Sequence, residues 1–152
     1  DILFELVNYR WVQELEKYNS SPRISKKLNG TNREDIKRGN LKKFHKYLDL
    51  ENPDKKCFIS GKTIKNLSVD HVIPWSYLYS DDLWNLVYVE RGLNSSKSNT
   101  IPSEVTIQKL IDRNNRLIKI MDENKLKDKQ REELDLSIRR DYVKQFWIGC
   151  KG

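Results

Sequence analysis

The chain has 152 residues, 37% of them hydrophobic and 34% charged, with four Trp, seven Tyr and four Phe. This is the size of one ordinary domain, and the aromatic content excludes a disordered chain. No apolar run approaches the length of a membrane span or of a signal-peptide core, so we expect a protein of the cytoplasm with no membrane partner. The two cysteines, Cys57 and Cys150, form no motif, which predicts free thiols. Because the chain begins at Asp1 rather than Met, we expect it to be a portion of a longer protein.

The positive charge is concentrated in one segment. Residues 22–65 hold 13 Lys and Arg against 5 Asp and Glu, a net charge of +8, whereas the whole chain carries +7. Such a cluster suits a polyanion such as DNA or RNA. A solvated, lysine-rich face would account for the same charge, and charge alone leaves both explanations open.

Two helices are predicted before residue 52. Apolar residues recur at three- and four-residue intervals from Leu3 to Tyr18, and again from Leu41 to Leu48, where Asn40 can cap the start. His45 lies in the second helix with no other metal-binding residue type at ligand spacing, so it is interpreted as a surface or packing residue.

Helical periodicity is absent between Asn52 and Pro102 and is replaced by short apolar runs. The runs Cys57–Ile59, Val69–Ile73 and Leu86–Val89 predict three strands, with a turn at Gly61 and with Pro74 closing the second strand.

Helices return after Pro102. Ser103 can cap a helix whose apolar face runs from Ile107 to Met121. A charged stretch, residues 122–133, precedes a single last helix that carries Leu136 to Trp147, with Gly149 beyond its end. The pattern predicts an α+β fold in three regions: a basic helical region (1–51), a small β unit (52–102) and a helical region (103–152).

An acid and an imidazole stand side by side at Asp70 and His71, in a strand otherwise made of apolar residues. Adjacent strand residues point to opposite faces, so a purely structural pair would bury at least one polar group that needs a partner. Asn85 follows fourteen positions after His71, directly before the next strand, and Asn94 begins a polar run nine positions later. Singly, each is explained as a turn cap, a core histidine or a loop residue.

Taken together, these residues and their spacing resemble the HNH (ββα-metal) endonuclease signature. The segment 69–102 is similar to the HNH domain of restriction-type and RNA-guided CRISPR nucleases, including a lysine, Lys97, three residues after the last Asn. The resemblance implies that residues 52–102 form a ββα-metal core flanked by helices.

The resemblance also implies a set of roles. Hydrolysis of a phosphodiester needs a nucleophile made from water and a cation to bear developing charge, and Mg²⁺ needs only one or two protein oxygens. Asp70 and Asn94 would hold Mg²⁺ or Mn²⁺, and His71 would accept a proton from the attacking water. Asn85 would orient the His71 segment, and Lys97 would reach a phosphate or the leaving oxygen.

One departure from the family pattern concerns zinc. Many HNH domains hold a structural zinc through two Cys-x2-Cys pairs, which here read Cys57-x2-Ser60 and Glu90-x2-Leu93. Only one of four thiolates remains, so we expect no structural zinc, with Cys57 as a small buried residue. Packing would then hold the unit together through Phe58, Leu67, Leu86 and Leu93.

The loop between the last two strands leaves two alternatives open. Asp81-Asp82 could bind a cation, although a solvated turn is the favoured interpretation. The loop aromatics Trp75, Tyr77, Tyr79 and Trp84 either stack on bases or pack against the strands.

The sequence therefore predicts a metal-dependent endonuclease that acts on DNA, as a module of a larger restriction, CRISPR or other anti-phage defence protein. RNA, or a guide RNA within a larger complex, is an alternative partner, and a catalytically silent module that binds nucleic acid or a partner subunit is the alternative function. The expected nucleic-acid contacts are Lys26, Lys27, Lys42, Lys43, Lys46, Lys62 and Lys65.

Overall fold

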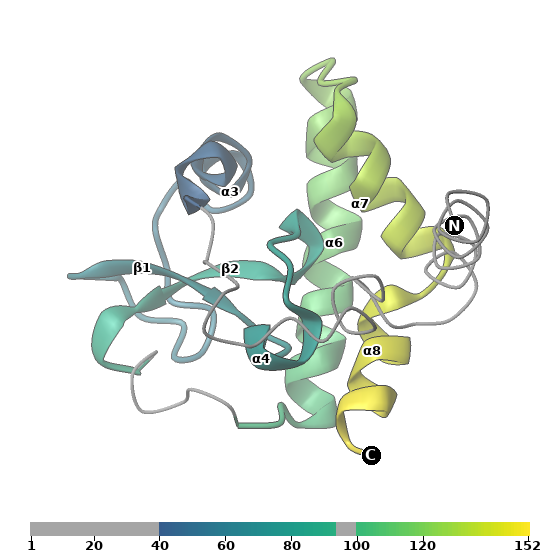
Figure 1. Ribbon diagram of the computed structural model, residues 1–152. Coiled ribbons are helices and arrows are strands. Elements are labelled where there is room, and N and C mark those ends of the chain that lie inside the picture. The colour runs from purple at the N-terminus through teal and green to yellow at the C-terminus, as the bar shows by residue number, and fades with distance from the viewer. Residues whose placement is uncertain (1–39, 94–99) are drawn as a thin grey trace, which may run out of the picture.

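The computed structural model describes residues 40–93 and 100–152, and this part of the chain has the expected α+β fold (Figure 1). The elements in chain order are η2 (Leu41–Phe44), α3 (His45–Glu51), β1 (Leu67–His71), α4 (Trp75–Leu78), η3 (Leu83–Asn85), β2 (Leu86–Glu90), α6 (Glu104–Glu123), α7 (Lys129–Arg139) and α8 (Tyr142–Cys150). In Figure 1, the long helix α6 stands between the two-stranded hairpin and the pair α7 and α8. The helix predicted from Leu3 to Tyr18 lies outside the described residues.

The first described helical segment begins as the sequence predicts. The Asn40 side chain accepts a hydrogen bond from the Lys42 amide at 2.9 Å, which satisfies one of the free amides at a helix start. The His45 ring packs edge-on against Tyr88, with ring centroids 5.6 Å apart. His45 is therefore a packing residue, as predicted.

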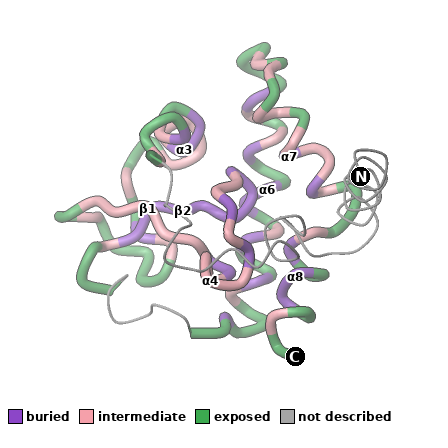
Figure 2. Tube along the Cα trace, in the orientation of Figure 1, coloured by how far each residue is buried: buried purple, intermediate pink, exposed green. Residues whose placement is uncertain are grey.

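The strands β1 and β2 pair in antiparallel register, from Leu67 opposite Glu90 to His71 opposite Leu86. Figure 2 shows β2 as a buried strand and β1 as intermediate. Both strands were predicted, but β1 covers residues 67–71 rather than 69–73. It ends early because the Ile73 amide bonds to the side chain of Asn85 instead of to a strand.

The strand predicted at Cys57–Ile59 is wrong. The described residues there have only one isolated bridge, between Lys56 and Thr63, and the chain turns back at once through a bond from the Gly61 amide to the Cys57 carbonyl at 2.8 Å. Gly61 supplies the left-handed backbone conformation of this turn, with φ of 73°. The turn at Gly61 was predicted correctly, and its tightness leaves no room for a strand.

The helix after Pro102 is confirmed, with the Ser103 side chain accepting from the Thr106 amide at 3.3 Å. The prediction of a single last helix is wrong, because the chain forms two helices, α7 and α8. Asp141, with φ of 53°, separates them. Gly149 lies inside α8 rather than beyond it. A Cβ at Gly149 would overlap the hydroxyl at the end of the Tyr77 side chain, so α4 approaches α8 closely at this glycine.

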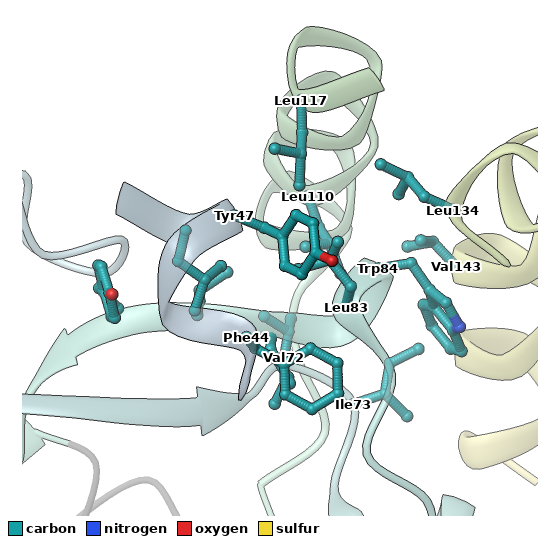
Figure 3. Packing of buried hydrophobic residues seen from close by; sticks show 14 of the residues in the cluster. Phe44, Tyr47, Val72, Ile73, Leu83, Trp84, Leu110, Leu117, Leu134 and Val143 are labelled. Atoms are coloured by element: carbon teal, nitrogen blue, oxygen red, sulfur yellow. The ribbon is translucent and has the colours of Figure 1, made fainter. Parts of the chain in front are cut away.

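The hydrophobic core draws on the helices and on the β unit alike. Figure 3 shows Leu110 and Leu117 of α6 facing a space shared with Leu83 of η3 and Leu134 of α7, all at most 1% exposed. Each such side chain contributes roughly 1.5–3 kcal/mol by leaving water. The ring of Trp84 stacks on Phe146 of α8 with centroids 5.3 Å apart. The loop that contains Asn85 is thereby held against the C-terminal helices.

Candidate active site

Asp70 and His71 are the last two residues of β1, and they pair with Val87 and Leu86 of the buried strand β2. Neighbouring strand residues point to opposite faces of a sheet, so the two side chains leave the strand in different directions. Both residues are half-buried, and only 8% of the His71 side chain is exposed. A buried imidazole needs a hydrogen-bond partner.

Asp81 is that partner. The Nε2 atom of His71 lies 2.8 Å from Oδ1 of Asp81, and only 16% of the Asp81 side chain is exposed. The solvated turn favoured from the sequence is therefore wrong for Asp81, because the residue is turned inward onto the imidazole. Asp82 accepts a short hydrogen bond from Ser80 instead.

The backbone conformation between Pro74 and Asp81 brings Asp81 back to His71. After Pro74 the short helix α4 reverses the chain, and Tyr79 follows it in the left-handed region with φ of 54°. The Trp75 and Tyr79 rings pack edge to face at 5.3 Å. Trp84 is 4% exposed and stacked inside the core, so for Trp84 the packing interpretation is correct.

Asn85 is completely buried and bonds to the segment that follows His71. Its Oδ1 accepts from the Ile73 amide at 2.8 Å, and its Nδ2 donates to the Ile73 carbonyl at 2.9 Å. Its own carbonyl accepts from the Val72 amide at 3.0 Å. Three hydrogen bonds therefore join the loop before β2 to the exit of β1, and leaving such buried groups unpaired costs about 1–3 kcal/mol each.

The positions that correspond to zinc ligands in the family pattern are bonded differently in this chain. The Cys57 sulfur is buried and accepts from the Glu90 amide at 3.4 Å, while the Glu90 carboxylate accepts from the amides of Lys65 and Asn66. Burial raises the pKa of the Cys57 thiol, but the hydrogen bonds from Ser60, Glu90 and Ile59 outweigh it and leave the pKa below its usual range.

Packing accounts for part of the same region. Leu86 is fully buried, and Phe58 and Leu67 pack against the core as predicted. Leu93 is 37% exposed, so its predicted packing role is wrong.

The described lysines of the predicted nucleic-acid surface fall into two groups on different elements. Lys42, Lys43 and Lys46 are exposed on η2 and α3, and Lys62 and Lys65 are exposed on the loop before β1. Four other predicted residues, Lys26, Lys27, Asn94 and Lys97, lie outside the described residues.

Comparison with known proteins found one family model that matches the segment around this site. Residues 57–103 match the family model described as HNH endonuclease. This match supports the assignment of the segment to the HNH endonucleases and suggests a nuclease that acts on nucleic acid. Comparison with curated proteins and with solved structures gave no significant match. Within the described ranges, no helix is both long enough and apolar enough to cross a membrane.

HNH nucleases generally use a divalent metal ion, and the described donors can be compared with that requirement. Residues 40–93 and 100–152 contain no group of three or more His, Cys, Asp or Glu arranged as metal ligands. Mg²⁺ and Mn²⁺ do not require such a cage, because they keep bound waters and accept one or two carboxylate or amide oxygens. The Asp70 carboxylate suits a hard cation of this kind.

Proposed function

We propose that the chain hydrolyses phosphodiester bonds in DNA, with a divalent cation, Mg²⁺ or Mn²⁺, held by Asp70 and Asn94. The observation that supports this most strongly is the buried Asn85 amide, bonded in both directions to Ile73, two residues after His71. An acid and an imidazole thus stand at the end of one strand, and a buried amide bonds to the backbone two residues after the imidazole, within the segment that matches the HNH family.

His71 acts as the general base in this proposal. A nitrogen and a carboxylate oxygen 2.8 Å apart need a hydrogen between them, and an ionised carboxylate has none to donate. The hydrogen therefore lies on Nε2, and Nδ1 is the nitrogen that accepts the proton of the attacking water. The water oxygen bonds to phosphorus, the bond from phosphorus to the leaving sugar oxygen breaks, and that oxygen takes up a proton from a solvent water.

Asp81 and Asn85 orient the base. The Asp81 carboxylate holds the imidazole ring, and Asn85 fixes the backbone that follows it. A cation bound by Asp70 and Asn94 would supply charge stabilisation on the phosphate oxygens. Lys97 would contact a phosphate, and the exposed lysines would hold the nucleic-acid backbone.

We further propose, from the family resemblance, that the chain is the nuclease module of a larger restriction, CRISPR or other anti-phage defence protein. Other domains, subunits or a guide RNA would then select the DNA.

A nicking assay on supercoiled plasmid tests the proposal. The full chain should nick the plasmid with Mg²⁺ or Mn²⁺ and not with EDTA, and Asp70→Asn should lower the rate about a hundredfold or more. Asp112→Asn is the matched control, since Asp112 is exposed on α6 and bonds to Gln108. Cleavage in EDTA, or by Asp70→Asn at the parent rate, would refute the metal role. A parent that binds the plasmid in a mobility-shift assay without cutting it would identify a binding module instead.

A further inference from the structure

Arg113 is a buried cation in the middle of α6. Only 3% of it is exposed, and its guanidinium donates to three backbone carbonyls and to its neighbour's side chain. Its acceptors are the carbonyls of Leu86 at 2.5 Å, Leu83 at 3.1 Å and Trp84 at 3.4 Å, and Oδ1 of Asn114 at 3.0 Å. Asn114 in turn donates to the Trp84 carbonyl at 2.9 Å. Two adjacent side chains of α6 thus hold one short stretch of backbone.

Burying the charge of Arg113 costs free energy, and an apolar side chain at the same position of the core would avoid this cost. Burial lowers the pKa of Arg113 to about 10, with Glu51 partly opposing the effect, so the side chain stays charged at neutral pH. Removing a charge from water is unfavourable, and apolar side chains of similar volume often stabilise a core better. Leu110 and Leu117, one turn to either side on the same helix, are such residues.

The backbone that Arg113 and Asn114 hold surrounds Asn85. Among residues 83–86, three carbonyls accept from α6, and the fourth, that of Asn85, accepts from the Val72 amide. The Asn85 side chain then holds both polar backbone groups of Ile73. A continuous series of hydrogen bonds therefore runs from α6 through Asn85 to the residues next to His71.

We propose that Arg113 and Asn114 are positioning residues of the active site, which act through Asn85 on the orientation of His71. The inference rests on the proposed nuclease function. It assigns part of the site to α6, a helix that begins at Glu104 and lies beyond the matched segment 57–103. Lys109 of the same helix also donates to the Phe58 carbonyl, so α6 forms hydrogen bonds with the matched segment at two places.

The test compares substitutions at Arg113 with two controls on the same helix, all in the full chain. Arg113→Met removes all the donors, and Arg113→Lys keeps the charge on a single nitrogen that cannot span three carbonyls. Arg116→Met controls for charge, because Arg116 is exposed and pairs with Glu51. Leu117→Val controls for a loss of core packing without a loss of hydrogen bonds.

Two measurements are made on each variant. Amide hydrogen exchange at Val72 and Ile73 reports the Asn85 contacts without any need for nuclease activity. Cleavage kinetics, measured well below each melting temperature, give kcat and KM for DNA. The double variant Arg113→Met with Asn85→Ser tests whether the two residues act in one series.

A positioning role predicts that amide exchange at Val72 and Ile73 is faster in both Arg113 variants than in the parent. This increase should be larger than any increase in α7. A positioning role also predicts a kcat lower by about tenfold to a hundredfold with KM little changed, because small misplacements of a catalytic group cost this much. The kcat of the double variant should be little lower than that of the less active single variant. Both controls should keep the parent kcat.

Unchanged exchange at Val72 and Ile73, a kcat equal to that of Leu117→Val, or additive losses in the double variant would overturn the inference. If both Arg113 variants fail to fold, Arg113 is a structural residue and the assignment is wrong. If the parent cuts no DNA, the proposed function fails, and the exchange measurement alone still decides whether α6 controls the His71 segment.

Discussion

His71 and Asp81 are ten positions apart in the chain, yet their side chains meet at 2.8 Å. A carboxylate on one imidazole nitrogen fixes both the ring orientation and the tautomer, which leaves the other nitrogen free to accept a proton. At the scale of single residues, this contact is the feature that distinguishes the site from an isolated histidine in a strand.

Substitution of Asp81 should separate orientation from charge. Asp81→Asn keeps an oxygen that can accept from Nε2, whereas Asp81→Ala removes the partner. We expect kcat for plasmid cleavage to fall by about tenfold to a hundredfold in Asp81→Ala and by less in Asp81→Asn, with KM unchanged. Asp82→Asn is the matched control, since the adjacent Asp82 bonds to Ser80. Equal activity of Asp81→Ala and the parent would show that His71 needs no carboxylate.

This residue contact could not be predicted from the sequence. The acid pair at Asp81 and Asp82 was visible, but its direction depends on the turn of α4 and on the left-handed backbone of Tyr79. A tyrosine seldom adopts this conformation, so no local signal indicated it. Asp70, His71 and Asn85, in contrast, could be singled out because their order and spacing follow a known signature.

At the scale of elements, helices α3 and α7 are joined by Asp128. Its Oδ1 accepts from the Arg131 amide at 3.0 Å and caps α7, and its Oδ2 accepts from the Tyr47 hydroxyl of α3. Burial raises the pKa of the Asp128 carboxyl, but the bonds from Tyr47 and Arg131 and the charge of Lys46 lower it further, so the net pKa lies below its usual range. Burial and Asp128 together raise the pKa of Tyr47 to about 12.

The lowered pKa of Asp128 predicts an acid-dependent stability. The folded state has the lower pKa, so the contribution is complete above the unfolded value of about 3.9 and is lost as the pH falls through the folded value. At pH 7, Asp128→Asn should lower the free energy of unfolding by about 1 kcal/mol, since asparagine can still cap the helix. Urea denaturation at pH 7 and pH 3 measures this, with Asp112→Asn as the control. A difference between parent and Asp128→Asn that does not shrink at pH 3 would contradict this assignment.

Element boundaries were predictable where a side chain determines them locally. Asn40 and Ser103 cap their helices as their residue types indicate. The break between α7 and α8 was not predictable, because the apolar period continues across it while Asp141 adopts a left-handed conformation. The packing of Trp84 beside Tyr142 and Phe146 accompanies this break, and such a contact is non-local.

At the scale of the whole molecule, the segment that matches the HNH family is embedded in helices outside it. Arg113 and Asn114 lie on the buried face of α6, one helical turn after Leu110 and one turn before Leu117. Two polar residues at positions where the helical period predicts buried apolar residues could be noticed in the sequence. Their role could not be predicted, because it depends on the backbone carbonyls of η3 and β2 to which they donate. Hydrogen bonds from Arg113 and Asn114 thus connect the helix α6 to the backbone around Asn85.

The comparison of the two histidines tests the central claim most directly. Plasmid cleavage under single-turnover conditions with Mg²⁺ should be slower in His71→Ala by about a hundredfold to ten-thousandfold, the range for loss of a general base. His45→Ala, which removes only a ring packed on Tyr88, should cleave at a rate close to that of the parent. Cleavage by His71→Ala at the parent rate would contradict the account.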